Sequence, residues 1–261
     1  MANHGAMWSR FFRMLAEARV NPRPNPQFIR EIRSLFNFLQ GYFRYETRGL
    51  EHVPKRGPAL LVMNHGVLPF HAYLLIREIF FRLGRLPRTL GARFLFQTPL
   101  LREIAVQVGA MNANHRNAKA ALEAGELVLV APGGIYEALL VHPGMKTIPW
   151  HGRYGFAVVA CKMGAPIIPT YCQGINEVYL TSRVFLRQRV RILRRIRFSL
   201  PFFFGIGLLP FPVKLVHRIG KPISTKRRKG ESFRKAVRRI HEEVLAAMRE
   251  LMQEKDGEKS L

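Results

Sequence analysis

The stretch Leu61–Leu75, "LVMNHGVLPFHAYLL", contains the boundary that decides the fold. Its first residues continue an apolar run that begins at Ala59, and this run predicts a buried strand over 59–64. The strand ends in Asn64, His65 and Gly66. Ligands of open α/β sheets bind beyond the carboxyl ends of the strands, and the near-neutral pKa of histidine suits general-base catalysis. His65 is therefore the first candidate catalytic residue.

Apolar runs of the same kind alternate with helical patterns along the chain. The alternation predicts an α/β sandwich with a mostly parallel sheet. The further predicted strands are 126–131 and 165–171, and the predicted helices are 27–43, 93–107, 115–124 and 153–163.

The second strand also ends in unusual residues, Pro132, Gly133 and Gly134, with Glu137 three positions further on. The carboxyl ends of parallel strands meet at one edge of a sheet, so this segment should lie near His65. Glycine allows a ligand to approach backbone N–H groups, and a glutamate can position a polar head group. We interpret the segment as a substrate-binding block.

The charge of the chain indicates a polyanionic partner. Lys and Arg number 42 against 17 Asp and Glu, which gives a net charge of +25 and points to nucleic acid or to an anionic membrane surface. Aspartate occurs once, at Asp256 in the polar tail, which removes the usual two-metal phosphoryl-transfer sites and any Ser-His-Asp triad unless glutamate substitutes. The two cysteines lack CxxC spacing, so we expect reduced thiols in a cytosol-facing protein.

Basic amphipathic segments favour the membrane over nucleic acid. In residues 1–44, Trp8, Phe11, Phe12 and Leu15 recur at helical spacing among arginines, and the alternative is a helix that packs on the domain itself. Residues 183–197 hold seven arginines around Leu186, Val190 and Leu193. Residues 225–261 form a basic C-terminal helix and tail, which leaves 45–224 as the central domain.

The longest uncharged stretch, 198–213, is interrupted by proline and glycine and is too short to span a bilayer. Its phenylalanines suit an acyl chain or the bilayer interface, or they pack over the core. The N-terminus lacks the apolar segment of a secretory signal. We therefore expect a cytosol-facing protein that associates with one leaflet without a spanning helix.

Four ordered motifs, "NHGVLP", "APGGIYEAL", "HGRYGFAVVACKMGAPIIPTY" and "FPVKLVHRIGKPI", resemble the glycerolipid O-acyltransferase superfamily. Within it the chain is similar to the branch of diacylglycerol acyltransferase type 2 and the phytyl ester synthases. The resemblance covers about Tyr45 to Ser224. The bacterial phosphatidate-forming enzymes have Pro-Glu-Gly where this chain has Pro-Gly-Gly.

The resemblance implies transfer of a fatty acyl group from acyl-CoA or acyl-carrier protein, as co-substrate, to a lipid hydroxyl. It implies no metal and no other cofactor. A neutral acylglycerol or a long-chain alcohol is the favoured acceptor, with a lysophospholipid as the alternative. His65 matches the family base. The residues carried over as substrate-binding are Asn64, Gly66, Pro132, Gly133, Gly134, Glu137 and Arg153.

His71 is the departure from the family pattern. In HGxxPxD the acid falls at His71, so a histidine stands where an orienting carboxylate is expected, and we treat His71 as a second catalytic candidate. Loss of the orienting carboxylate in a serine protease lowers the rate by about 10⁴. His71 could accept a hydrogen bond from His65, or Glu78, Glu103 or Glu137 could replace the acid.

Three other functional classes remain as alternatives. A catalytically weakened relative that binds anionic lipids fits the missing acid, and nucleic-acid binding rests on charge alone, without an RNA-binding signature. A metal hydrolase built on His65, His71 and His151 lacks nearby Asp or Cys ligands and the i, i+4 spacing. The oligomeric state is not predicted.

Overall fold

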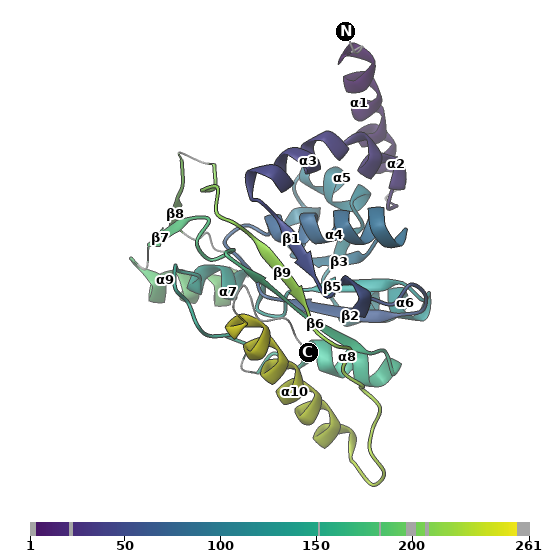
Figure 1. Cartoon of the computed structure of the whole chain (residues 1–261), viewed down its shortest axis with the longest axis vertical. Helices are drawn as coiled ribbons and strands as arrows, with labels where there is room; N and C mark the ends of the chain where they lie inside the picture. Colours follow the sequence, from purple (N-terminus) through teal and green to yellow (C-terminus); the bar gives the residue numbers. More distant parts are fainter. Residues whose placement is uncertain are drawn as a thin grey trace.

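The structure is a computed structural model that describes residues 4–20, 23–150, 152–182, 184–196, 202–206 and 209–254. Its centre is a seven-stranded sheet with the order β1-β9-β6-β2-β5-β3-β4, and β7 and β8 form a separate two-stranded ribbon (Figure 1). The strands are β1 (Glu46–Arg48), β2 (Ala59–Met63), β3 (Arg88–Gly91), β4 (Ala110–Asn112), β5 (Leu127–Val130), β6 (Ile167–Gln173), β7 (Leu180–Ser182), β8 (Phe202–Phe204) and β9 (Val216–Ile219).

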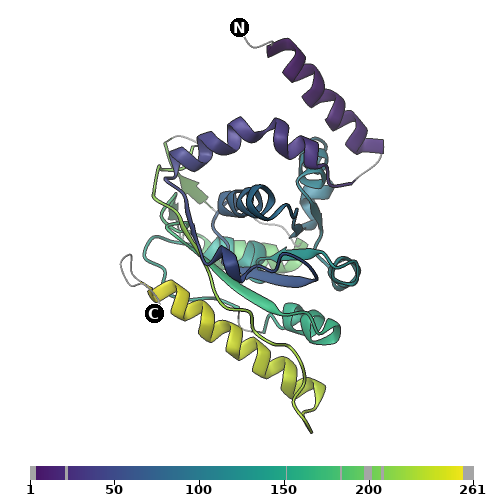
Figure 2. The ribbon, with the colours of Figure 1, turned by 45° about the vertical axis from the view of Figure 1, so that its right-hand side comes forward.

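Helices cover both faces of the sheet, as Figures 1 and 2 show. The α-helices are α1 (His4–Val20), α2 (Pro26–Glu31), α3 (Arg33–Tyr42), α4 (Phe70–Leu83), α5 (Leu101–Gln107), α6 (His115–Glu123), α7 (Gly134–Leu140), α8 (Gly155–Met163), α9 (Leu186–Ile196) and α10 (Phe233–Gln253). Two short 3-10 helices, η1 (Leu50–His52) and η2 (Arg93–Phe96), complete the described elements.

The strand β2 lies at the middle of the sheet and is buried at all five positions. It pairs in parallel with β5 on one side and with β6 on the other. Leu60 and Val62 pack into the core under α8 and α10, and Leu61 and Met63 pack into the core under α4. This burial on both faces explains why the segment reads as a continuous apolar run.

The predicted α/β sandwich with a mostly parallel sheet is confirmed, with one exception in direction. β6 and β9 pair antiparallel, so β9 and its parallel neighbour β1 run against the other five strands. The predicted helix over 93–107 is divided into η2 and α5, with Pro99 between them. The predicted helix over 27–43 is divided at Ile32 into α2 and α3.

The C-terminal helix is part of the sandwich and not a separate basic segment. The apolar side of α10, including Val237, Ile240, Val244 and Met248, lies in the core against β6 and α8. The predicted boundary at 224 therefore does not separate two packing units. The amphipathic pattern of α10 reflects coverage of the sheet, which leaves only its polar face toward solvent.

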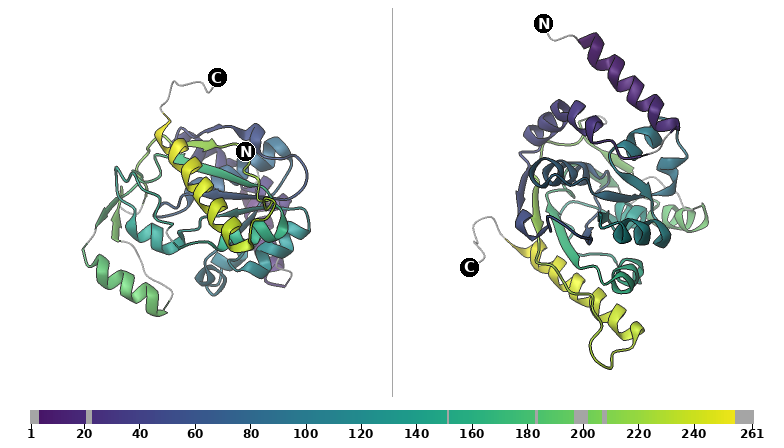
Figure 3. Two further views of the ribbon diagram at one scale, coloured as in Figure 1. Left: turned by 90° about the horizontal axis from the view of Figure 1, so that it is seen from below. Right: turned by 90° about the vertical axis from the view of Figure 1, so that its right-hand side faces the viewer.

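The N-terminal helix α1 packs partly on the domain, as the alternative interpretation had it, and Figures 2 and 3 show it reaching away from the sheet. Met14 and Leu15 are buried, and Phe11 stacks on Phe28. Phe12 remains 62% exposed. One face of α1 thus packs on α2 and α5, and the other face points toward solvent.

Candidate active site

His65 stands directly beyond β2 at the carboxyl end of the central strand, where the sequence predicts it. The half-buried ring donates Nδ1–H to the backbone carbonyl oxygen of Gly66. This bond assigns the proton to Nδ1 and leaves the Nε2 lone pair free, which is the tautomer that a general base requires. Burial lowers the pKa of His65 below its usual 6.5, while the bond to Gly66 raises it. The ring is therefore neutral at pH 7.

Asn64 fastens the end of β2 to the neighbouring strand β6. Its Nδ2 donates to the carbonyl oxygen of Cys172 at 3.2 Å, and the Cys172 N–H donates to its Oδ1 at 2.8 Å. This reciprocal pair continues the parallel ladder one residue past Met63. Both polar groups of the predicted substrate-binding residue are thus engaged by protein, which gives Asn64 a positioning role.

Glu137 lies on α7 beside His65, with its carboxylate turned into the protein. The side chain is buried, and its Oε2 accepts the indole N–H of Trp150 at 2.8 Å. A hydrogen bond with the backbone of His65 also involves this carboxyl. Burial raises the pKa of Glu137 to about 7, and these two hydrogen bonds oppose the rise. Glu137 therefore contacts the backbone of His65.

Gly133 makes room for this arrangement. A Cβ at Gly133 would lie 2.1 Å from Oε2 and 2.4 Å from Cβ of Glu137, so no rotation of the glutamate side chain relieves the overlap. The next residue, Gly134, has the left-handed φ of 51°, and its N–H donates to the Ala131 carbonyl oxygen. The Gly134 N–H is therefore engaged in the turn, contrary to the expectation that a ligand would reach it.

The other predicted site residues lie around this centre. A Cβ at Gly66 would lie 2.5 Å from Cγ1 of Ile175, so the glycine permits close packing of the loop that follows His65. Pro132 is half-buried at the end of β5, which pairs with β2. The exposed guanidinium of Arg153 lies over the ring of Tyr136 on α7, 5.6 Å from its centroid.

His71 lies in the first turn of α4, and its ring hydrogen bond goes to Asn64, not to the ring of His65. Its Nε2 donates to the carbonyl oxygen of Asn64 at 2.9 Å. The ring is fully buried, which lowers its pKa to about 3. His71 thus contacts the backbone of the residue that precedes His65.

The remaining candidate acids are engaged elsewhere. Glu78 pairs with Arg77 and Arg82 on α4, and Glu103 accepts the Leu100 N–H at the start of α5. Of the three glutamates considered from the sequence, Glu137 is the one that contacts His65. The His65 ring donates its Nδ1–H to the Gly66 carbonyl oxygen and not to a carboxylate. This acceptor orients the imidazole without a full negative charge.

The stability of the fold should depend on the protonation of Glu137. Its pKa is about 7 in the folded state against 4.5 in the usual range, so folding retains the proton. This contribution is complete below pH 4.5 and is lost as the pH rises through 7, a loss of about 3 kcal/mol at 1.36 kcal/mol per pKa unit. Glu137→Gln stays neutral at every pH, and its amide oxygen can accept the Trp150 N–H. As the pH rises from 5 to 8, the free energy of unfolding of the variant should therefore fall less than that of the wild type.

Urea unfolding of both proteins at pH 5 and pH 8, in the same mild detergent, measures this difference. The two pH dependences should differ by about 2.5 kcal/mol, with the variant gaining relative to the wild type at pH 8. Parallel pH dependences would show that the carboxyl is not desolvated in the folded state.

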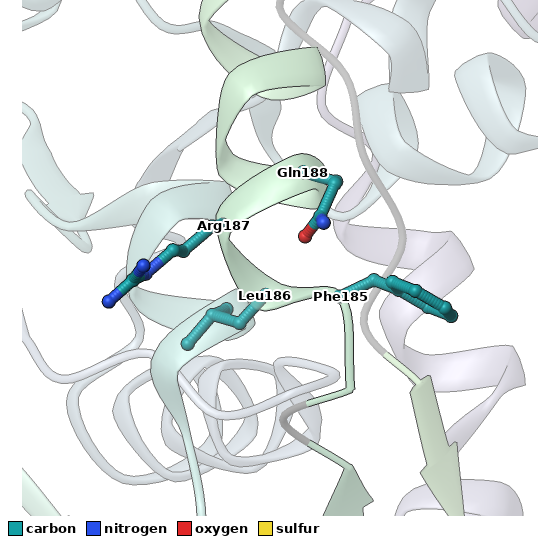
Figure 4. Close-up of a pocket in the computed structure, with 4 residues that line it drawn as sticks. All are labelled: Phe185, Leu186, Arg187 and Gln188. Atoms are coloured by element: carbon teal, nitrogen blue, oxygen red, sulfur yellow. The ribbon is translucent and has the colours of Figure 1, made fainter.

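Two surface hollows lie away from these residues. One of about 350 Å³ is lined by Phe185, Leu186, Arg187 and Gln188 at the start of α9, where Arg187 and Phe185 point in opposite directions (Figure 4). The other, of about 620 Å³, lies at the start of α10 and is lined by charged side chains, among them Arg234 and Glu242. Neither is lined by His65 or Glu137.

The described residues hold neither a metal-binding cluster nor a membrane-spanning helix. Within the described ranges, no cluster of three or more His, Cys, Asp or Glu is arranged to hold a metal ion, and His151 lies outside those ranges. Among the helices described above, none has the length and apolar character needed to cross a membrane.

The fold recurs in a solved structure. The crystal structure of the 1-acyl-sn-glycerophosphate (LPA) acyltransferase PlsC from Thermotoga maritima superimposes with a TM-score of 0.55, at 18% sequence identity, over 88% of this chain and 81% of that one. The α/β sandwich of this chain thus has the same fold as that acyltransferase. This likeness establishes the fold alone.

The sequence comparisons define the family. The family described as "Diacylglycerol acyltransferase" matches residues 33–260, and the chain belongs to this family. A cattle protein named "DGAT1/2-independent enzyme synthesizing storage lipids" is 34% identical over 69% of this chain and 52% of its own length, and the human protein of that name is also 34% identical. An uncharacterised Mycobacterium tuberculosis protein is 32% identical over 80% of the chain. The chain spans about half the length of the mammalian relatives.

Several residues that support the site were not predicted from the sequence. Trp150 holds Glu137 and Cys172 holds Asn64, while Tyr45 and His217 lie buried behind His71. The position of Trp150 could have been noticed in the sequence, because this tryptophan directly precedes the motif that contains Arg153. Cys172 offered none, because it contributes its backbone.

Proposed function

We propose that this protein is an O-acyltransferase in which His65 activates the hydroxyl group of a lipid. The observation that carries the proposal is the neutral imidazole beyond β2, whose Nδ1–H bonds to the Gly66 carbonyl oxygen and whose Nε2 is free. Membership in the diacylglycerol acyltransferase family supports the reaction class.

The reaction is a transfer between a thioester and an alcohol. Nε2 of His65 removes the hydroxyl proton of the acceptor, whose oxygen attacks the thioester carbonyl carbon of acyl-CoA or acyl-carrier protein. The tetrahedral intermediate collapses with cleavage of the C–S bond. The thiolate leaves and takes the proton from the imidazolium, which restores the neutral base.

The site supplies orientation more than charge. Asn64 and Glu137 hold the backbone on either side of the base, and the Gly66 carbonyl oxygen holds its ring. A carbonyl oxygen stabilises the transient imidazolium less than a carboxylate does. The enzyme is therefore active without the usual acid, and positioning accounts for most of its rate enhancement.

The favoured acceptor is a neutral acylglycerol or a long-chain alcohol, with lysophospholipid as the competing substrate. The name of the mammalian relatives, which refers to storage lipids, supports the neutral class. The test incubates purified protein with labelled acyl-CoA or acyl-carrier protein and a panel of acceptors, with His65→Ala in parallel. Turnover that disappears in the variant excludes the alternative of a protein that only binds lipid.

We further propose that the enzyme works at an anionic membrane surface, which it contacts through β7, α9 and β8, here called the flap. Figure 1 places the flap beside α7, and Figure 3 shows it extending from the body of the molecule. Leu180 and Phe204 are paired across the ribbon and are 56% and 63% exposed. Large apolar side chains exposed together are typical of an interaction surface.

The helix α9 gives the flap its charge. Arg187, Arg191, Arg194 and Arg195 are exposed, whereas Leu186, Val190 and Leu193 are half-buried in a helix that contacts α7. The apolar stripe predicted from the sequence therefore serves packing, and the cationic side faces outward. Basic side chains beside exposed aromatic residues match an anionic leaflet.

Binding to anionic vesicles should fall sharply when the four exposed arginines of α9 are replaced by glutamine. Each basic residue near an anionic leaflet contributes about 1 kcal/mol, so the partition coefficient should fall by about 10²- to 10³-fold. Vesicle flotation at several salt concentrations measures it. The matched control replaces Lys226, Arg227, Arg228 and Lys229, exposed on the loop before α10, and removes the same charge elsewhere. Equal losses in both variants would contradict a specific role for the flap.

A further inference from the structure

Two buried imidazoles, His71 on α4 and His217 on β9, form a pair that the proposed chemistry does not use. Both rings are 0% exposed, and their centroids are 5.8 Å apart with 32° between the planes. Each ring has one nitrogen in a hydrogen bond. The other nitrogens, Nδ1 of His71 and Nε2 of His217, are buried without a partner among the described residues. Buried polar atoms without partners are rare and call for an explanation.

The hydrogen bonds that do exist fix the proton on His71. Its Nε2 lies 2.9 Å from the carbonyl oxygen of Asn64, and a carbonyl oxygen only accepts. Nε2 of His71 therefore carries the proton. The ring is neutral, because burial lowers its pKa to about 3, and its Nδ1 is an acceptor that needs a donor.

His217 can supply that donor through its Nε2–H. Its Nδ1 lies 3.1 Å from the phenol oxygen of Tyr45, whose pKa burial raises, so the phenol keeps its proton. If Tyr45 donates to Nδ1, then Nε2 of His217 carries the proton and can serve as a donor for the unpartnered acceptor on His71. In the opposite tautomer Nε2 of His217 and Nδ1 of His71 are both acceptors, and only a molecule that donates to both of them could satisfy them.

We propose that Tyr45, His217 and His71 form a one-directional hydrogen-bond relay that holds the peptide between Asn64 and His65. Tyr45 O–H donates to His217 Nδ1, His217 Nε2–H donates through one water molecule to His71 Nδ1, and His71 Nε2–H donates to the Asn64 carbonyl oxygen. The three are positioning residues, and their effect on rate rests on the proposed function of His65.

The relay completes the support of the base from a third direction. The Asn64 side chain is fixed to β6, the backbone of His65 to Glu137 on α7, and the Asn64 carbonyl oxygen to α4 through His71. The titratable groups whose charges act on the relay are His65, Cys172, Glu78 and Arg77, and the last two pair with each other. A neutral relay orients the base without adding charge.

The first test reads the tautomers directly and needs no activity. Long-range proton–nitrogen NMR spectra of histidine-labelled protein in detergent micelles should show His71 and His217 neutral at pH 6 to 8 with the proton on Nε2. In Tyr45→Phe the donor to Nδ1 is lost while Nε2–H keeps its acceptor, so the tautomer of His217 should stay the same and its Nδ1 resonance should move toward that of an unbonded acceptor nitrogen. A proton on Nδ1 of either ring in the wild type, or a charged His71 at pH 6, would overturn the relay even if acyl transfer is confirmed.

The second test separates the two ends of His71 by a matched pair of variants. Glutamine reaches the Nε2 position and can still donate to Asn64, whereas asparagine reaches only the Nδ1 position. His71→Gln should keep kcat within about tenfold, and His71→Asn should lose about 10²-fold with an unchanged KM, because misplacement of a catalytic group by about 1 Å has that effect. Equal losses in two folded variants would refute the positioning role. If either variant fails to fold, the wild-type and Tyr45→Phe spectra decide.

Discussion

His65→Ala is expected to lower kcat for acyl transfer by about 10²- to 10⁴-fold, the range that a general base contributes. The variant removes the nitrogen that accepts the proton and leaves Asn64, Glu137 and their hydrogen bonds in place. Because the side chain is half-buried and bonds only to the adjacent carbonyl group, the fold should survive. Initial rates at saturating acceptor, with the melting temperature as a check on folding, measure the effect.

The matched control is His115→Ala, which removes an exposed histidine in the first turn of α6 and should leave kcat unchanged. The pH profile provides a second readout. Burial lowers the pKa of His65, so kcat/KM of the wild type should stay level from pH 8 down to 6.5 and fall below it, as the base takes up a proton. Residual turnover in His65→Ala equal to that of the wild type would remove His65 as the base.

Gly133→Ala is expected to lower kcat by about 10²-fold and to destabilise the fold by about 1–3 kcal/mol. The φ of Gly133 is −69°, which any residue adopts, so the effect is purely steric. The added Cβ would meet the Cβ of Glu137 at 2.4 Å, and only a shift of the backbone of α7 can separate them. That shift would carry the Glu137 carboxyl away from Trp150 and from the backbone of the base.

Gly41→Ala serves as the control for this prediction. Gly41 lies within α3, and a Cβ there would meet no atom within 4 Å, so alanine should stabilise the helix by about 0.5–1 kcal/mol and leave kcat unaltered. Thermal melts and initial rates of both variants give the comparison. A Gly133→Ala protein with the stability and rate of the wild type would show that Glu137 does not lie over Gly133.

The sequence predicted the positions of His65 and of the Pro132–Glu137 block because both depend on local patterns. An apolar run that ends at a polar residue marks the end of a buried strand, and parallel strands bring such ends to one edge. It did not predict the short strands β3 and β4, because three or four residues give too little periodicity to recognise. The amphipathic pattern of α10 was read as a basic segment, although its apolar face covers the sheet.

By itself the sequence determined where three buried strands lie along the chain and that His65 follows one of them. It also determined the glycines at 133 and 134 and the absence of aspartate from the folded domain. Only the tertiary structure decided what each side chain contacts. His71 is six residues from His65, yet its ring bonds to the backbone of Asn64, while the partners Trp150, Cys172 and His217 come from distant segments. Local spacing fixes where a strand ends, but hydrogen-bond partners depend on how α4, α7, β6 and β9 pack around that end.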